Sequence, residues 1–109
     1  MTTYDYIVNN VDTCIDDMEQ LVDNLLRADA SGQFLASSAR FLTAVDAVKF
    51  HPHIGRLVMG AIEKDRERRY IGSLLEALWG PDYRERSYEL SMADDNFRRI
   101  YKRIYPEGF

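Results

Sequence analysis

The apolar residues of the first quarter of the chain recur at helical spacing. Steps of four and three alternate through Ile7, Val11, Cys14, Met18, Leu21 and Leu25. This alternation is typical of a helix that buries one continuous stripe. We therefore predict a first long helix over about residues 4–28.

A second apolar pattern predicts a helix over about residues 33–50, where proline at position 52 stops it. Its main apolar face is predicted from Phe34, Phe41, Val45 and Val48, with Leu35 and Leu42 beside them. The other side carries the short side chains of Ala36, Thr43 and Ala47, which would let another backbone come close. We expect this helix to be the most buried one.

The pattern changes phase in the stretch 53–79. Ile54, Leu57 and Val58 begin an apolar face, but Asp65, Arg68 and Arg69 occupy its continuation. Apolar residues then return on a face rotated by roughly 120°. The stretch is therefore either one kinked or extended helix, or two helices separated by a break near 65–72.

Gly80 and Pro81 predict the end of that stretch. Residues 83–90 give no clean period, so a short helix and a loop are equal alternatives. Ser91 and Asp94 have the spacing of a capping box, which predicts a last helix over about 92–105. Its buried stripe is predicted to be Phe97, Ile100, Tyr101 and Ile104, with four cations turned outward.

The predicted fold is all-α: an up-and-down bundle of three long helices, 4–28, 33–50 and 53–79, plus the short helix 92–105. A break near 65–72 would make it a four- or five-helix bundle. The length of 109 residues fits a single domain, 1–109. The predicted core is Ile7, Val11, Cys14, Met18, Leu25, Phe34, Phe41, Val45, Val48, Leu57, Ala61, Leu75 and Leu78.

Composition narrows the class of protein. Hydrophobic residues make up 46% and charged residues 29%, which is ordinary for a globular protein. Cys14 is the single cysteine, so an internal disulfide is excluded, a reducing compartment is favoured and a buried, inert thiol is expected. The start lacks the pattern of a secretory signal, and no apolar run approaches the roughly 20 residues that span a membrane. We expect a cytoplasmic protein without a membrane segment.

The net charge of −4 is unevenly distributed, because residues 1–33 carry seven acidic side chains against one basic one. On the first predicted helix the acidic side chains fall on the side opposite the apolar stripe: Asp5, Asp12, Asp16, Glu19 and Asp23. As one helix, this row would be about 27 Å long. Such an acidic ridge would attract a basic protein partner, although a solvated helix face or pairing with the basic C-terminal helix gives the same pattern.

The charged block from Glu63 to Arg69 interrupts a core stripe and has mixed helical pairing. A polar site or a contact with another chain would explain it, as would a solvated helix extension. The candidate partner-binding residues are therefore Asp12, Asp16, Glu19, Asp23, Asp65, Arg68 and Arg69.

No pattern indicates a catalytic, cofactor or metal site. His51 and His53 would need further ligands such as Asp46 or Cys14, and no pair has metal-ligand spacing along a helix. The chain has no glycine-rich phosphate loop and no recognisable nucleophile frame. We therefore expect no enzyme, no cofactor and no metal.

The sequence favours a small non-catalytic interaction or regulatory protein, such as an inhibitor, an antitoxin- or immunity-like factor, or an adaptor, that binds a basic protein through its acidic helix face. A self-associating structural bundle, for instance a homodimer, is the first alternative. Nucleic-acid contact through the basic last helix is a weaker alternative, because the whole chain is acidic.

Overall fold

The computed structural model describes residues 2–107, and within this range it contains helices and no strands. The all-α class is confirmed, but the helices are shorter and more numerous than predicted. In chain order they are α1 (Thr3–Asn10), the 3-10 turn η1 (Ile15–Asp17), α2 (Met18–Ala28), α3 (Gln33–Asp46), α4 (His51–Lys64), α5 (Gly72–Trp79), α6 (Ser87–Ala93) and α7 (Asp95–Ile104).

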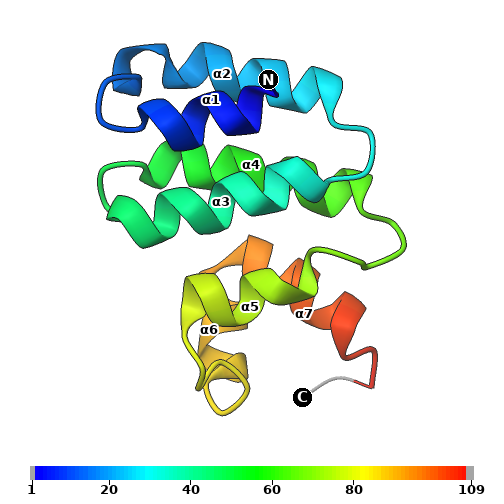
Figure 1. The fold of residues 1–109 in the computed structure, drawn as a ribbon. Helices are drawn as coiled ribbons and strands as arrows, with labels where there is room; N and C mark the ends of the chain where they lie inside the picture. The colour runs from blue at the N-terminus through cyan, green and yellow to red at the C-terminus, as the bar shows by residue number, and fades with distance from the viewer. Residues whose placement is uncertain (1, 108–109) are drawn as a thin grey trace.

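The helices form three stacked pairs (Figure 1). The pairs are α1 with α2, α3 with α4, and α5 with α7, while α6 packs beside α7. Contacts between pairs run through α1, α3 and α5 in one layer and through α2, α4 and α7 in the other. The smallest Cα extent, 17 Å, corresponds to these two helix layers. The pair α3–α4 is therefore the centre of the stack.

The predicted long helix 4–28 is wrong, because the chain turns back between α1 and α2. Cys14 and Thr13 donate backbone N–H groups to the carbonyl of Asn10, at 2.9 and 3.0 Å, and these bonds close the turn. Every residue from Asn9 to Asp17 is Asn, Asp, Val, Ile, Thr or Cys, all of which are weaker helix formers than Leu, Glu, Lys or Gln. The turn therefore lies in a segment of low helix propensity.

The buried face of α3 also differs from the prediction. Its fully buried residues are Leu35, Ala36, Ser38, Ala39 and Leu42. The predicted main face is only half-buried at Phe34 and Phe41, while Val45 is 44% exposed and Val48, beyond the helix end, 87% exposed. Because α3 contacts α1, α2, α4 and α5, its neighbours surround most of its circumference, and they bury a different set of positions from the predicted main face.

The central stretch breaks between α4 and α5, as one of the two alternatives proposed. The Asp65 carboxylate accepts the backbone N–H groups of Arg69, Tyr70 and Ile71, at 2.9, 2.7 and 2.8 Å. Arg68 has a positive φ of 61°, which turns the chain inside this loop. A buried carboxylate thus stabilises the break between α4 and α5, at the place where the apolar pattern of the sequence changes phase.

The last helix begins later than predicted. Ser91 lies inside α6 instead of capping the following helix, and Asp94 is the N-cap of α7. The Asp94 carboxylate accepts the N–H groups of Asn96 and Phe97, at 2.9 and 3.3 Å. Of the ambiguous segment 83–90, the part from Ser87 onward is helical.

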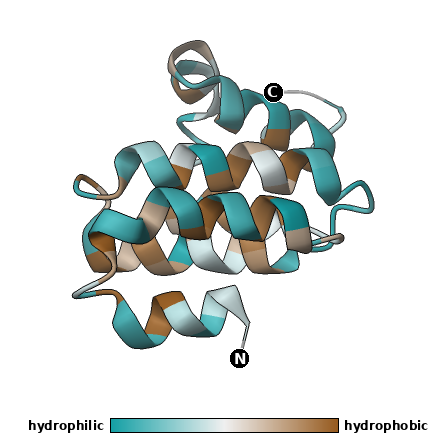
Figure 2. Cartoon of the chain, turned by 90° about the horizontal axis from the view of Figure 1, so that it is seen from above, coloured by the Kyte–Doolittle hydropathy of each residue, from teal (hydrophilic) through white to brown (hydrophobic). Residues whose placement is uncertain are grey.

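The core joins all three pairs. Of the predicted core residues, Ile7, Cys14, Met18, Leu25, Leu57, Ala61 and Leu75 are buried, while Val11 and Leu78 are half-buried. Hydrophobic and hydrophilic positions alternate around the helices (Figure 2), as expected for amphipathic helices in two layers. No helix among residues 2–107 is long and apolar enough to cross a membrane.

Candidate functional site

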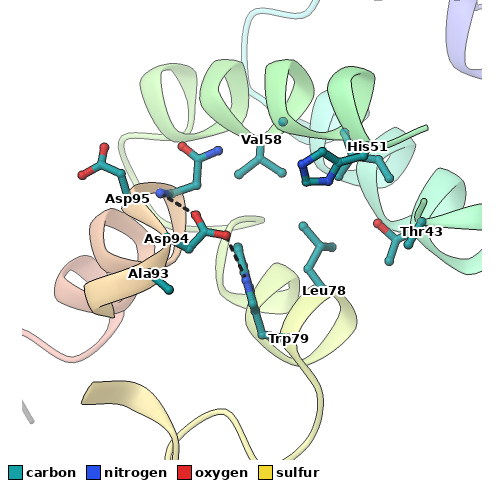
Figure 3. Close-up of a pocket in the computed structure, with 12 residues that line it drawn as sticks. Thr43, His51, Val58, Leu78, Trp79, Ala93, Asp94 and Asp95 are labelled. Carbon is teal, nitrogen blue, oxygen red and sulfur yellow. Dashed lines mark hydrogen bonds between the residues drawn. The ribbon is translucent and has the colours of Figure 1, made fainter. Parts of the chain in front are cut away.

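A groove of about 480 Å³ lies between the central pair and the third pair. Its floor is one face of the first two turns of α4, formed by His51, Ile54, Gly55 and Val58 (Figure 3). The remaining lining residues are Thr43 of α3, Ala47 of the following turn, Leu78 and Trp79 of α5, and Ala93, Asp94, Asp95 and Asn96 of the α6–α7 junction.

The groove exists because α7 covers only part of α4. The two helices run in the same direction, since Arg103 near the end of α7 donates to the carbonyl of Ile62 near the end of α4, at 2.6 Å. The start of α7, at Asp95, already lies beside the groove. The first two turns of α4 therefore lie along the groove, where His51 is exposed and Gly55 half-buried, while Ile54 and Val58 are 8% and 1% exposed.

Gly55 deepens the floor. A methyl group built on its Cα would meet no atom within 4 Å. The contrast with Gly60, one turn further on, is clear, because a methyl group there would lie 2.4 Å from Leu26 Cδ2. Gly60 therefore packs closely against the side chains of Leu26 and Leu35, whereas Gly55 faces open space.

The wall opposite the floor is held by Trp79. Its indole N–H donates to Oδ2 of Asp94 at 3.2 Å, and its ring packs edge-on against Phe97 with centroids 5.2 Å apart. The other oxygen of the Asp94 carboxylate caps α7. One aspartate thus ties α5 to the start of α7 and fixes the width of the groove.

The charged side chains that line the groove are both acidic, Asp94 and Asp95. The hydrogen bond from Arg98 holds the pKa of the exposed Asp95 carboxyl below its usual value, so the carboxyl is ionised at neutral pH. Lys49 lies in the nearby α3–α4 turn, but its ammonium group sits over the Phe50 ring, 5.4 Å from the centroid.

The predicted acidic ridge does not exist as a straight row, because Asp12 lies in the α1–α2 turn and Asp16 in η1. Asp12, Asp16 and Glu19 are exposed. Asp23 on α2 pairs with Arg56 on α4, one contact between the acidic N-terminal part and the rest of the chain. The four candidate carboxylates therefore lie in the α1–α2 turn, in η1 and on α2, and they do not form one straight row on a helix.

The predicted residues of the charged block have separate roles. Asp65 is 2% exposed and its carboxylate is committed to the loop, so it offers no surface for a partner. Arg68 donates to the carbonyl of Arg103 at 3.1 Å, and Arg69 pairs with Glu67 at 2.6 Å. A smaller hollow of about 230 Å³ adjoins this loop and shares no lining residue with the groove.

The remaining candidates take no part in a cluster of ligands. His51 lines the groove, and Cys14 is buried, as predicted, with its thiol pKa raised by desolvation. In the described range 2–107, no group of three or more His, Cys, Asp or Glu side chains could hold a metal ion.

No residue that lines the groove is among the partner-binding residues predicted from the sequence. The signal that could have indicated the floor is the spacing of His51, Ile54, Gly55 and Val58, which places a glycine in the middle of an apolar helix face. The first residue of α7 could not be predicted from the spacing of apolar residues, because the cap formed by Asp94 sets it.

No protein-family model matches this chain, and neither a curated protein nor a solved structure matches it.

Proposed function

We propose that this protein is a small non-catalytic interaction protein that binds another protein in the groove on α4. The observation that carries the proposal is the groove of about 480 Å³ beside α4, which is open at Gly55 and walled by Trp79. A concave groove of this size, lined by apolar side chains and a few polar ones, favours the binding of side chains from another molecule.

The exposed carboxylates Asp12, Asp16 and Glu19 have a supporting role in this proposal. They belong to the α1–α2 turn and the start of α2, at the same end of the stack as the α3–α4 turn beside the groove (Figure 1). Charges at that end would raise the rate at which a basic partner arrives.

Site-specific photo-crosslinking in an extract of the native source tests the proposal. A photoreactive residue replaces Ala93, which is exposed and lines the groove, or Gln20, which is exposed on α2, as a control position. The expected result is a protein adduct from position 93 that Gly55→Leu removes and Gly55→Ala retains. Both substitutions remove the glycine, but only leucine fills the groove.

An adduct that forms equally from position 20, or that survives Gly55→Leu, contradicts the proposal. An adduct of twice the mass of this chain identifies a second copy, and the self-associating bundle then replaces the foreign partner.

A further inference from the structure

We propose that a second surface of this protein, apart from the groove, binds the phosphate backbone of a nucleic acid. This surface is the basic end, defined as the last turn of α4, the α4–α5 loop and the last turn of α7. Its cations are Lys64, Arg66, Arg68, Arg69, Lys102 and Arg103. The inference does not rest on the proposed function, because the hollow in this surface shares no lining residue with the groove.

The two segments of the basic end are far apart in sequence but lie side by side at one end of the stack (Figure 1). Arg103 donates from Nη1 to the carbonyl of Ile62 at 2.6 Å, and Arg68 donates from Nη1 to the carbonyl of Arg103 at 3.1 Å. The acceptors are neutral carbonyls, so both guanidinium groups keep an unpaired positive charge. Each also keeps further N–H donors.

The carboxylates of the basic end do not neutralise its cations. Segments 63–71 and 100–105 carry six basic side chains against three acidic ones. Of the acidic ones, Asp65 is buried and accepts backbone N–H groups of the loop. The side chains of Arg66 and Lys102 are exposed and form no hydrogen bond or ion pair with any residue of the range 2–107. The surplus positive charge therefore attracts an anionic partner.

The hollow of about 230 Å³ gives this charge a concave site. Lys64, Arg66 and Arg69 line it from the α4–α5 side, together with Glu67, and Ser31 lines it from the α2–α3 connection. Arg69 pairs with Glu67, but both side chains are about two-thirds exposed, and such a surface pair is weak. Guanidinium groups bind phosphate oxygens through two parallel N–H bonds, so a phosphate can replace Glu67 as the partner of Arg69.

The composition of the basic end favours a nucleic acid over an acidic protein. Interfaces between proteins have an apolar centre, whereas interfaces with nucleic acids are more polar and strongly positive. The large hydrophobic side chains that are exposed in the range 2–107 all lie outside the basic end: Tyr6, Val45, Val48, Met59, Tyr88 and Met92. Arginine also supplies four of the six cations.

The net negative charge of the chain does not oppose this contact, because the exposed carboxylates gather elsewhere. Asp12, Asp16 and Glu19 lie at the α1–α2 turn and the start of α2, at the opposite end of the stack (Figure 1). Phosphates would repel that end. A nucleic acid therefore contacts the basic end alone.

Fluorescence anisotropy with labelled DNA of about 16 nucleotides tests the proposal, as single strands and as duplexes of two unrelated sequences. The expected result is saturable binding with the same affinity for both sequences, because contacts to phosphate carry no sequence information. Four cations without a carboxylate partner predict that duplex affinity falls with salt at a log–log slope of about −3 to −4. The loss between about 50 and 200 mM salt is then roughly 100-fold.

Matched variants locate the contact. Arg66→Gln and Lys102→Gln, one in each segment, should each weaken binding several-fold and reduce the magnitude of the salt slope by about 1. Lys49→Gln removes the same charge from the α3–α4 turn, at the other end of α4, and should leave binding unchanged. Gly55→Leu in the groove should also leave it unchanged. Circular dichroism reports the fold of each variant.

Absence of saturable binding at about 50 mM salt overturns the inference, as does an equal loss from Lys49→Gln and Lys102→Gln. Poly-glutamate that displaces the DNA at equal charge concentration would make an acidic protein the partner, and the nucleic-acid inference would be wrong. Displacement by inorganic phosphate at the same concentration of phosphate groups would show a site for a small phosphate compound instead. None of these outcomes bears on the crosslinking from position 93, so the proposed function is tested separately.

Discussion

Three aspartates at helix ends stabilise the connections between helices in this protein. Asp29, Asp65 and Asp94 each donate a backbone N–H to the carbonyl four residues earlier, which ends the preceding helix. Their carboxylates then accept N–H groups of the residues that follow. A short side chain with two acceptor oxygens satisfies several donors that a helix start leaves free. Each of these aspartates therefore fixes the angle between two helices.

Replacing Asp65 with alanine should lower the free energy of unfolding by about 2–4 kcal/mol, because three backbone N–H groups lose their acceptor. Urea denaturation measures the change. Glu67→Ala is the control, since the Glu67 side chain is 70% exposed and should change stability by less than about 0.5 kcal/mol. Similar losses in the two variants would refute the structural role of Asp65.

Arg68 has a positive φ of 61°, which is unfavourable for residues with a Cβ atom. Arg68→Gly should therefore be more stable than Arg68→Ala by about 1 kcal/mol, measured by thermal melts. The same two substitutions at Arg66, a loop residue without a positive φ, should show no advantage for glycine. A more stable alanine variant at position 68 would show that the loop adopts another conformation.

At the scale of helices, α3 illustrates how position in the stack selects the buried face. Leu42 is fully buried on the side facing α4, whereas Val48 lies in the turn and is 87% exposed. Both residues belong to the same apolar pattern in the sequence. The neighbours of α3, not its own periodicity, decide which of them is in the core.

Leu42→Ala should cost about 2–5 kcal/mol of unfolding free energy, because it leaves a cavity between α3 and α4. Val48→Ala should change the free energy by less than about 0.5 kcal/mol. Denaturation midpoints of the two variants check this difference. A large loss from Val48→Ala would mean that a partner or second copy covers the turn.

The turn before α6 is tied to α7 by tyrosines. The hydroxyl groups of Tyr83 and Tyr105 are 2.8 Å apart, and this hydrogen bond, together with burial, raises the pKa of Tyr83 to about 12 from the ordinary value of 10.0. Folding thus favours the neutral phenol. Its contribution to stability is complete below pH 10.0 and is lost as the pH rises toward about 12.

We therefore expect the melting temperature to fall between about pH 10 and 12, and to fall less steeply in Tyr83→Phe. Tyr88→Phe is the control, because Tyr88 is 70% exposed and should leave the slope of the wild type unchanged. Identical slopes in the Tyr83 variant and the wild type would contradict the hydrogen bond's role.

At the scale of the whole molecule, the local stability of a helix pair should depend on its position in the stack. The pair α3–α4 contacts both other pairs, whereas α1–α2 and α5–α7 each contact one (Figure 1). In proteins built from stacked helix pairs, terminal pairs open more readily than central ones. The groove lies between the second and third pairs, where α7 meets α4.

Native-state hydrogen exchange should therefore protect the amides of α3 and α4 most strongly, and those of α1 and α6 least. Mass spectrometry of proteolytic fragments measures this order. Uniform protection across all helices would indicate a single cooperative unit instead of a graded stack.

The sequence by itself determined the helical class, seven of the thirteen predicted core residues, and several of the regions where helices end. Glycine, proline and a change in apolar phase act locally, so they marked the helix boundaries near 51–52, 65–72 and 80, although α3 ends at Asp46 and not at the predicted residue 50. The low helix propensity of 9–17 was also present in the sequence, but the regular spacing of Ile7, Cys14 and Met18 concealed the turn.

Only the tertiary structure decided which face of each helix is buried and where the groove lies. A straight helix and a hairpin can bury the same apolar residues, so spacing alone does not distinguish them. The groove depends on where α7 starts beside α4, and the position of Asp94 against Trp79 sets that start. This contact joins residues from different helices, and it forms only when the third pair packs on the second.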